Sequence, residues 1–181
     1  MSRFGYVMTT YAGMLVFGIL SIVHFTPRLI WNASASAPIG LYVITPAKHL
    51  AVAELLAIDA PEPLAGFLAD RRYLPLGVPL MKHVAALPGQ RVCRTDRTIT
   101  IDGVVMGDAL ARDSRGRALP IWQGCRVIAA GQVFVMNAGV WDSLDGRYFG
   151  PLPTSSIVGR AIPLWTDERG AGRDQGRAPA H

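Results

Sequence analysis

The sequence predicts an all-β domain that follows a single N-terminal helix, and three observations support this prediction. First, residues 4–27 contain no Asp, Glu, Lys or Arg, whereas the chain after Arg28 has an ordinary globular composition. Second, that later part contains several short runs rich in β-branched and aromatic residues, bounded by proline and glycine. Third, Asp102-Gly103 stands between two such runs, and this dipeptide is typical of a two-residue hairpin turn. The 181 residues suffice for one medium-sized core.

Residues 1–28 are predicted to be a membrane anchor. The apolar run of residues 4–27 has the roughly 20 residues that a spanning helix needs. A cleaved signal peptide is the alternative, because Ala33-Ser34-Ala35 has the small-x-small pattern of a cleavage site. The run is longer than a usual signal core, and residues 27–31 intervene before that site, so a retained anchor is favoured.

The elements expected after the anchor belong to one domain over residues 29–166. The strand-like runs are residues 41–45, 80–87, 98–101, 104–106, 126–130 and 132–137. Residues 64–73 are typical of a short helix, whereas the Ala/Leu-rich residues 49–58 are compatible with a helix or a strand. The tail 167–181 is rich in Gly, Arg and Asp and is predicted to be disordered.

The charge pattern names no partner. The net charge is +5, and only Lys48 and Lys82 of the 18 basic residues are lysines. The arginines are scattered and form no basic run interleaved with aromatic residues, so nucleic acid is not a predicted partner. A weak attraction to anionic lipid headgroups is compatible with this charge.

Cys93 and Cys125 lie 32 positions apart, without a CxxC motif or a nearby histidine cluster. A metal site is therefore not predicted, and no cofactor is expected. If the domain lies in the periplasm, a disulfide between the two cysteines is the natural hypothesis. Two buried thiols are the alternative.

Ser34-Ala35-Ser36-Ala37-Pro38 is the first candidate for chemistry. Two serines two positions apart in an extended segment point the same way, and the small alanines leave room for another chain to approach. Stretches of Ser, Ala and Pro are more often plain linkers, so this segment alone does not indicate catalysis.

Lys82 is the second candidate. On a strand over residues 80–87 it shares a face with Leu80, Val84 and Ala86, and an apolar environment lowers the pKa of a lysine. A neutral amine can take a proton from a serine hydroxyl. An edge-strand lysine that reaches solvent is the commoner case.

The segment from residue 141 to residue 151 is the third candidate. Asp145 and Arg147 can pair and fix a turn that presents Ser143. A plain surface turn is the alternative.

Together, the three segments resemble the type I signal peptidase (leader peptidase) family. The matching motifs are Ser34-x-Ser36-x-Pro38, Lys82-x-x-x-Ala86-Leu87-Pro88-Gly89 and Ser143-x-Asp145-x-Arg147-Tyr148-Phe149-Gly150. Asn-x-Ser-x-Ser-x-Pro-x-Gly-Leu-Tyr at residues 32–42 resembles the conjugative-transfer (TraF-type) branch. The resemblance implies a signal-peptidase-like β-barrel or sandwich with a small β-hairpin insert at about residues 94–125. It also implies that residues 49–58 contain a strand.

The resemblance further implies a role for each matching residue. Ser36 is the expected nucleophile and Lys82 its general base. The Ser36 backbone N–H and the Ser34 hydroxyl form the expected oxyanion hole. Ser143 is expected to hold the lysine amine, with Asp145 and Arg147 bracing that loop. The family usually has serine where this chain has Gly146, which suggests a looser brace.

By the same resemblance, the catalytic domain is expected in the periplasm, on a single-pass anchor in the bacterial inner membrane. The expected partners are inner-membrane lipid and, as substrate, an exported precursor protein or a conjugative pilin precursor, whose maturation in some systems includes cyclisation. Two alternatives remain. A Ser-His-Asp hydrolase is disfavoured because no G-x-S-x-G elbow occurs and His83 alternates with Lys82 on the predicted strand. A non-catalytic β-domain that scaffolds a conjugation or secretion apparatus is the other.

Overall fold

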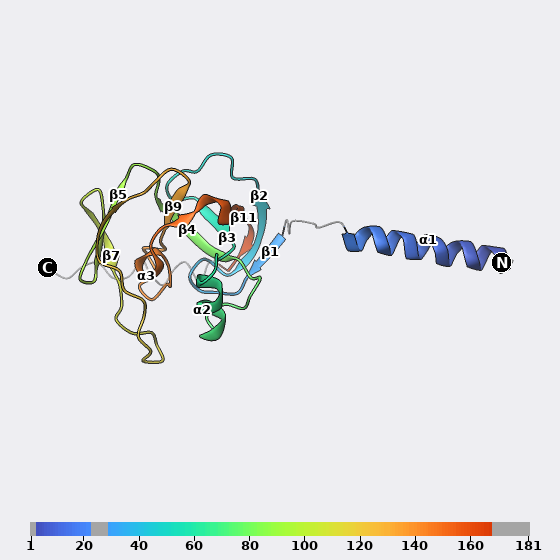
Figure 1. Ribbon diagram of the computed structural model, residues 1–181, viewed down its shortest axis with the longest axis horizontal. Coiled ribbons are helices and arrows are strands. Elements are labelled where there is room, and N and C mark those ends of the chain that lie inside the picture. The colour runs from blue at the N-terminus through green and yellow to red at the C-terminus, as the bar shows by residue number, and fades with distance from the viewer. Residues whose placement is uncertain (1–2, 23–28, 168–181) are drawn as a thin grey trace.

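The structure is a computed structural model that describes residues 3–22 and 29–167. A helix at the N-terminus precedes a mostly β domain, as predicted (Figure 1). In chain order the elements are α1 (Arg3–Ile22), β1 (Leu29–Asn32), β2 (Gly40–Thr45), β3 (Leu55–Ile58), α2 (Leu64–Asp70), β4 (Leu80–Ala86), β5 (Arg91–Thr95), β6 (Thr98–Ile101), β7 (Val104–Asp108), β8 (Gly124–Val127), β9 (Gln132–Val135), α3 (Gly146–Phe149), β10 (Leu152–Pro153), a 3₁₀ turn (Thr154–Ser156) and β11 (Ile157–Thr166). The elements without a counterpart in the sequence prediction are α3, β1, β5, β10 and β11.

The larger sheet is antiparallel and carries the strand with Lys82. Its seven strands lie in the order β1-β2-β11-β3-β4-β9-β10, so β4 is an interior strand between β3 and β9. The sheet curls because the ten-residue β11 pairs with β2 along one part of its length and with β3 along another (Figure 1). Shifts of register accompany both pairings, as expected where a strand bends.

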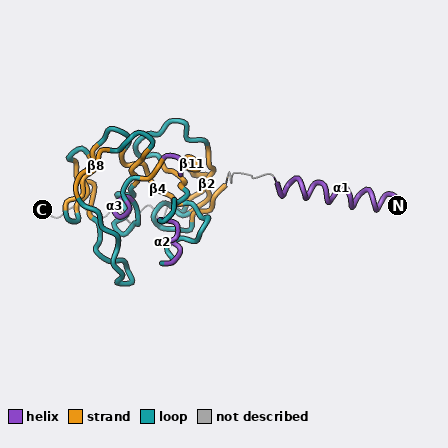
Figure 2. The backbone as a smooth tube through the Cα atoms, in the orientation of Figure 1, coloured by secondary structure: helices purple, strands orange, loops and turns teal. Residues whose placement is uncertain are grey.

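The insert forms a sheet of its own rather than a single hairpin. Its four strands lie in the order β7-β6-β5-β8 and extend from Arg91 to Val127, slightly beyond the predicted 94–125. Asp102 and Gly103 have positive φ angles of 49° and 84°, the conformation that the predicted hairpin turn requires. Between β7 and β8 the chain runs as a long loop, drawn in teal in Figure 2.

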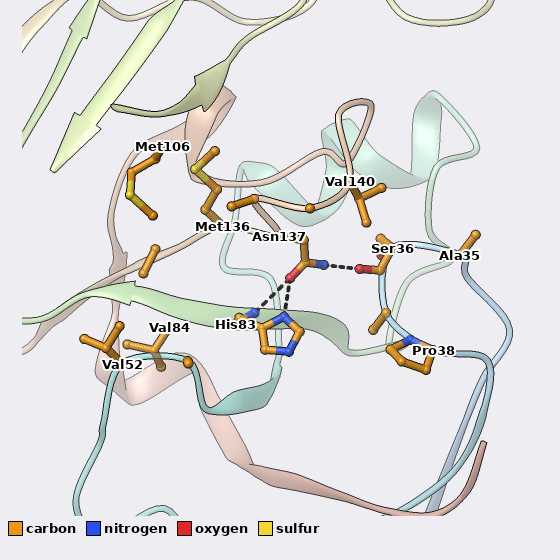
Figure 3. A pocket seen from close by; sticks show the side chains of 15 residues that line it. Ala35, Ser36, Pro38, Val52, His83, Val84, Met106, Met136, Asn137 and Val140 are labelled. Carbon is orange, nitrogen blue, oxygen red and sulfur yellow. Dashed lines mark hydrogen bonds between the residues drawn. The ribbon is translucent and has the colours of Figure 1, made fainter. Parts of the chain in front are cut away.

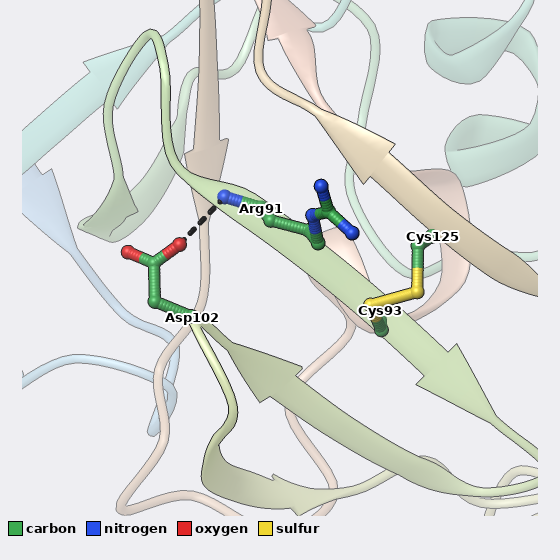
Figure 4. The surroundings of a disulfide bond; sticks show 4 residues. All are labelled: Arg91, Cys93, Asp102 and Cys125. Atoms are coloured by element: carbon green, nitrogen blue, oxygen red, sulfur yellow. Dashed lines mark hydrogen bonds between the residues drawn. A yellow bond between two sulfur atoms is a disulfide. The ribbon is translucent and has the colours of Figure 1, made fainter.

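A disulfide joins the first and last strands of the insert. Cys93 on β5 and Cys125 on β8 face each other in register, and their sulfur atoms are bonded (Figure 4). The bond thus links edge strand β8 to interior strand β5.

One apolar cluster connects the insert to the larger sheet. Val92 and Ile99 of the insert are buried together with Phe134 of β9 and with Met136, which follows β9. Trp122 packs edge-on against Phe134, with 6.5 Å between ring centroids. The insert therefore packs against the end of β9 and against Met136, from which the chain continues into the third motif.

Helix α1 exposes large apolar side chains, for example Phe4, Met14 and Phe17. None of the helices within the described residues has both the length and the hydropathy required of a membrane span. Part of the predicted anchor, residues 1–2 and 23–28, lies outside the described residues, as does the predicted tail after Asp167.

Candidate active site

The structure brings the three motifs together around one cavity of about 620 Å³. The serine motif lies between β1 and β2, Lys82 lies on β4, and Ser143 lies between β9 and α3. Ser34, Ser36, Lys82 and Ser143 all line this cavity. Residues more than 100 positions apart in the sequence therefore share one site.

The serine motif is a turn, as expected of a segment rich in Ser, Ala, Pro and Gly, and it is not extended around the two serines. The buried side chain of Asn32 holds it from inside, because its Nδ2 donates at 3.0–3.1 Å to three backbone carbonyls, those of Ser34, Ala37 and Pro38. The hydroxyl of Tyr42 also donates to the Pro38 carbonyl, at 2.6 Å. Sequence reasoning gave Asn32 no role, although asparagine ahead of a run of small residues is typical of such side-chain-stabilised turns.

The two serine hydroxyls form a hydrogen bond, with 3.0 Å between Ser34 Oγ and Ser36 Oγ. Ser34 Oγ also donates to Asn32 Oδ1 at 3.0 Å, so the proton between the serines comes from Ser36. To stabilise an oxyanion, the Ser34 hydroxyl must turn away from Asn32 once substrate occupies the site.

If Ser34 is the oxyanion donor that the family resemblance implies, replacing it by alanine is expected to lower kcat by about 10²–10³-fold. KM should change little, because the charge on the oxyanion develops only in the transition state. Steady-state kinetics on a precursor peptide measure both constants. A wild-type kcat for this variant would assign the second donor to another group.

Lys82 is buried on β4, with 3% of its surface exposed, among the side chains that the strand pattern predicted. Its Nζ donates to Ser143 Oγ at 2.8 Å. Desolvation by burial lowers the pKa of Lys82 from 10.5 to about 8. The negative charges of Asp145 and Asp142 act to raise this pKa, and the positive charge of Arg147 acts to lower it. In the described part of the chain no hydrogen bond joins Lys82 Nζ to Ser36 Oγ; the amine donates to Ser143 Oγ, and the Ser36 hydroxyl is hydrogen-bonded to Ser34 Oγ.

The pH dependence of activity follows from this lowered pKa. The neutral amine is the form that accepts a proton, so kcat/KM is expected to rise with pH until about pH 8 and then level off. A pH profile of peptide cleavage measures this acid limb. A limb near pH 6.5 that disappears in His83→Ala, with Lys82→Ala still active, would contradict the assignment and favour a histidine base.

Asp145 and Arg147 form a buried ion pair behind Ser143. Arg147 Nε and a terminal guanidinium nitrogen donate to the two carboxylate oxygens of Asp145, each at 2.9 Å. Arg147 also donates to four backbone carbonyls, those of Asp108, Val140, Trp141 and Ser143. The pair therefore fixes the backbone of the loop that presents Ser143 to Lys82.

Gly146, where the family usually has serine, stands at a position without room for a side chain, while the Asp145–Arg147 pair beside it keeps both of its hydrogen bonds. A Cβ atom at this position would lie 2.6 Å from the ring of Phe134 and 2.7 Å from the backbone oxygen of Val135. Glycine is needed here because β9 and the start of α3 approach too closely for a side chain.

A second cavity, of about 400 Å³, lies on the other side of Ser36 and is mostly apolar (Figure 3). His83, Val84 and Ala85 line this cavity, whereas Leu80, Met81 and Lys82 line the other, so the two linings follow position along β4 rather than alternate faces of the strand. The buried Asn137 lies between His83 and Ser36 and contacts both (Figure 3). Sequence reasoning gave Asn137 no role, and no local pattern marks it.

The comparison of sequences shows the same family. The chain matches the sequence profile of the family described as "Signal peptidase, peptidase S26" over residues 1–165, which include all three motifs. The conjugal transfer protein TraF of Agrobacterium fabrum is 37% identical over 146 residues, covering 75% of this chain and 81% of that protein. The probable conjugal transfer protein TraF of Sinorhizobium fredii is 34% identical over 163 residues, covering 84% and 85%. A crystal structure of a signal peptidase I from Enterococcus faecalis aligns with a TM-score of 0.38 at 21% identity, over 62% of this chain and 97% of that chain.

Proposed function

Because the chain belongs to the signal peptidase (S26) family, we propose that it is a serine endopeptidase that processes exported precursor proteins with Ser36 and Lys82. One observation carries this proposal. A lysine amine with a pKa lowered to about 8 is buried in the same cavity as Ser36. Such an amine is neutral in a useful fraction of molecules near neutral pH, so it can serve as a base.

The proposed mechanism uses the residues around that cavity. Neutral Lys82, oriented by Ser143, takes the proton of Ser36 Oγ as this oxygen attacks the scissile carbonyl. The backbone N–H of Ser36 and the hydroxyl of Ser34 stabilise the oxyanion. The Lys82 ammonium then protonates the leaving amine, and an acyl-enzyme on Ser36 remains. Water, or an amine of the substrate, releases the acyl group.

The TraF relatives suggest the substrate and the place of action. Since they are named as conjugal transfer proteins, we propose that this chain matures a pilin precursor of a conjugative apparatus. We further propose that α1 and the apolar residues up to 27 hold the chain at the inner membrane, with the catalytic domain in the periplasm. The exposed apolar side chains of α1 support this location, as does the disulfide, since the periplasm is oxidising.

The test is a cleavage assay with the full chain in detergent. Two substrates are compared, a conjugative pilin precursor and a general signal-peptide-bearing precursor, with Ser36→Ala as the matched inactive variant. Mass spectrometry is expected to show a product from wild type alone, and a product lighter by one water than the linear form would indicate cyclisation. Failure of the folded wild type to cleave either precursor would overturn the proposal and favour a non-catalytic scaffold.

A further inference from the structure

The side chain of Asn137 connects the backbone around the proposed nucleophile with the backbone around the proposed base. Its Nδ2 donates to the backbone carbonyl of Ser36 and, at 3.3 Å, to that of Met81 (Figure 3). Its Oδ1 accepts from the backbone N–H of His83 at 3.0 Å and lies 2.9 Å from His83 Nδ1. Met81 and His83 flank Lys82 on β4, so this single amide contacts the chain on both sides of the base.

These contacts occur where the regular pairing of β4 with its neighbour ends. Strand β9 ends at Val135, and Met136 N still donates to the His83 carbonyl at 2.9 Å. One residue later, the amide of Asn137 occupies the place that a continuing strand would have beside β4. Because the His83 N–H is a donor, Oδ1 must face β4, and this orientation directs Nδ2 towards Ser36.

Other hydrogen bonds of the serine turn do not provide this connection. The contacts of Asn32 and Tyr42 hold the shape of the turn, but both residues come from β1 and β2, beside the turn itself. Asn137 is buried, with 3% of its surface exposed, and its own N–H donates to Asp145 Oδ2 at 3.0 Å. It therefore links the turn, β4 and the loop that presents Ser143.

We propose that Asn137 is a positioning residue that sets the placement of Ser36 relative to Lys82, without touching either reacting atom. This inference rests on the proposed function, because it assigns to Asn137 the alignment of that dyad. Removing the amide frees the Ser36 carbonyl and leaves the turn intact but no longer fixed to β4. A misplacement of about 1 Å can cost on the order of 10²-fold in rate.

The test compares Asn137→Ala and Asn137→Asp with wild type and with Val92→Ala, in the full chain. Val92 is buried in the insert and lines neither cavity, and its truncation controls for lost stability. We expect Asn137→Ala to lower kcat by about 10²-fold with little change in KM and an unmoved acid limb. Asn137→Asp keeps the acceptor but adds a carboxylate near Lys82, so the acid limb should move to higher pH. Val92→Ala should keep the wild-type kcat at temperatures at which it is folded.

The outcomes separate this inference from the proposed function. If wild type cleaves the precursor and folded Asn137→Ala does so with wild-type kcat, the positioning role is wrong and the dyad stands. If Val92→Ala loses as much kcat as Asn137→Ala, the positioning role is also overturned, because the effect would then be one of stability. If wild type cleaves nothing, the proposed function fails and the catalytic role of Asn137 fails with it.

Discussion

Ser36→Ala and Lys82→Arg are each expected to reduce kcat on the precursor by about 10⁴–10⁶-fold, the range found when a member of a serine peptidase's catalytic set is removed. Ser36→Ala removes the attacking oxygen. Lys82→Arg keeps the positive charge, but a guanidinium does not deprotonate in proteins and cannot act as a base. Single-turnover assays with enzyme in excess measure such low rates.

The double variant provides the sharpest check on this pair. Residues that act as one unit have non-additive effects, so Ser36→Ala combined with Lys82→Arg should be about as slow as either alone. Circular dichroism of each variant confirms that the fold is retained. A Lys82→Arg kcat close to that of wild type would contradict the assignment of Lys82 as the base.

Asp145→Ala is expected to lower the free energy of unfolding by about 3–5 kcal/mol, because it leaves a buried guanidinium without its counterion. Asp145 is fully buried and Arg147 is 1% exposed, so water cannot replace the lost carboxylate. The loop that presents Ser143 depends on Arg147, and activity should therefore fall as well. Urea denaturation at neutral pH measures the stability change.

Glu54→Ala is the matched control for this variant. Glu54 pairs with Arg160 at 2.6 Å, but the two side chains are 21% and 35% exposed. Loss of such a partly exposed pair should cost no more than about 1 kcal/mol. If Asp145→Ala and Glu54→Ala lower the free energy of unfolding equally, burial does not determine how much the Asp145–Arg147 pair contributes to stability.

Features encoded by neighbouring residues could be predicted from the sequence. The run of residues 80–87 predicted the strand on which Lys82 is buried, although this strand is buried on both faces and not on one, and Asp102-Gly103 predicted the hairpin turn. The shape of the serine turn was not predicted, because it depends on how the amide of Asn32 folds back on the chain. Asn137 was missed for a related reason. Its partner Ser36 lies 101 positions away, and only the curl of the sheet brings the two together.

The steric constraint at Gly146 could not be predicted for the same physical reason. A motif comparison registers only that a side chain is missing at this position. The distance from Phe134 and Val135 shows that a side chain has no room there. Steric limits set by a neighbouring strand cannot be derived from the motif that they constrain.

The burial of Lys82 has a consequence for the folding equilibrium. An unfolded chain holds the lysine proton up to about pH 10.5, whereas the folded chain gives it up near pH 8. Between these values the unfolded state binds more protons, so stability should rise with pH across that window. Below pH 8 the folded chain bears the full cost of the buried ammonium, on the order of 3 kcal/mol at about 1.4 kcal/mol per pH unit. Lys82→Met should therefore be inactive yet more stable near neutral pH. A buried lysine at this position lowers the stability of the fold, and the proposed activity requires it.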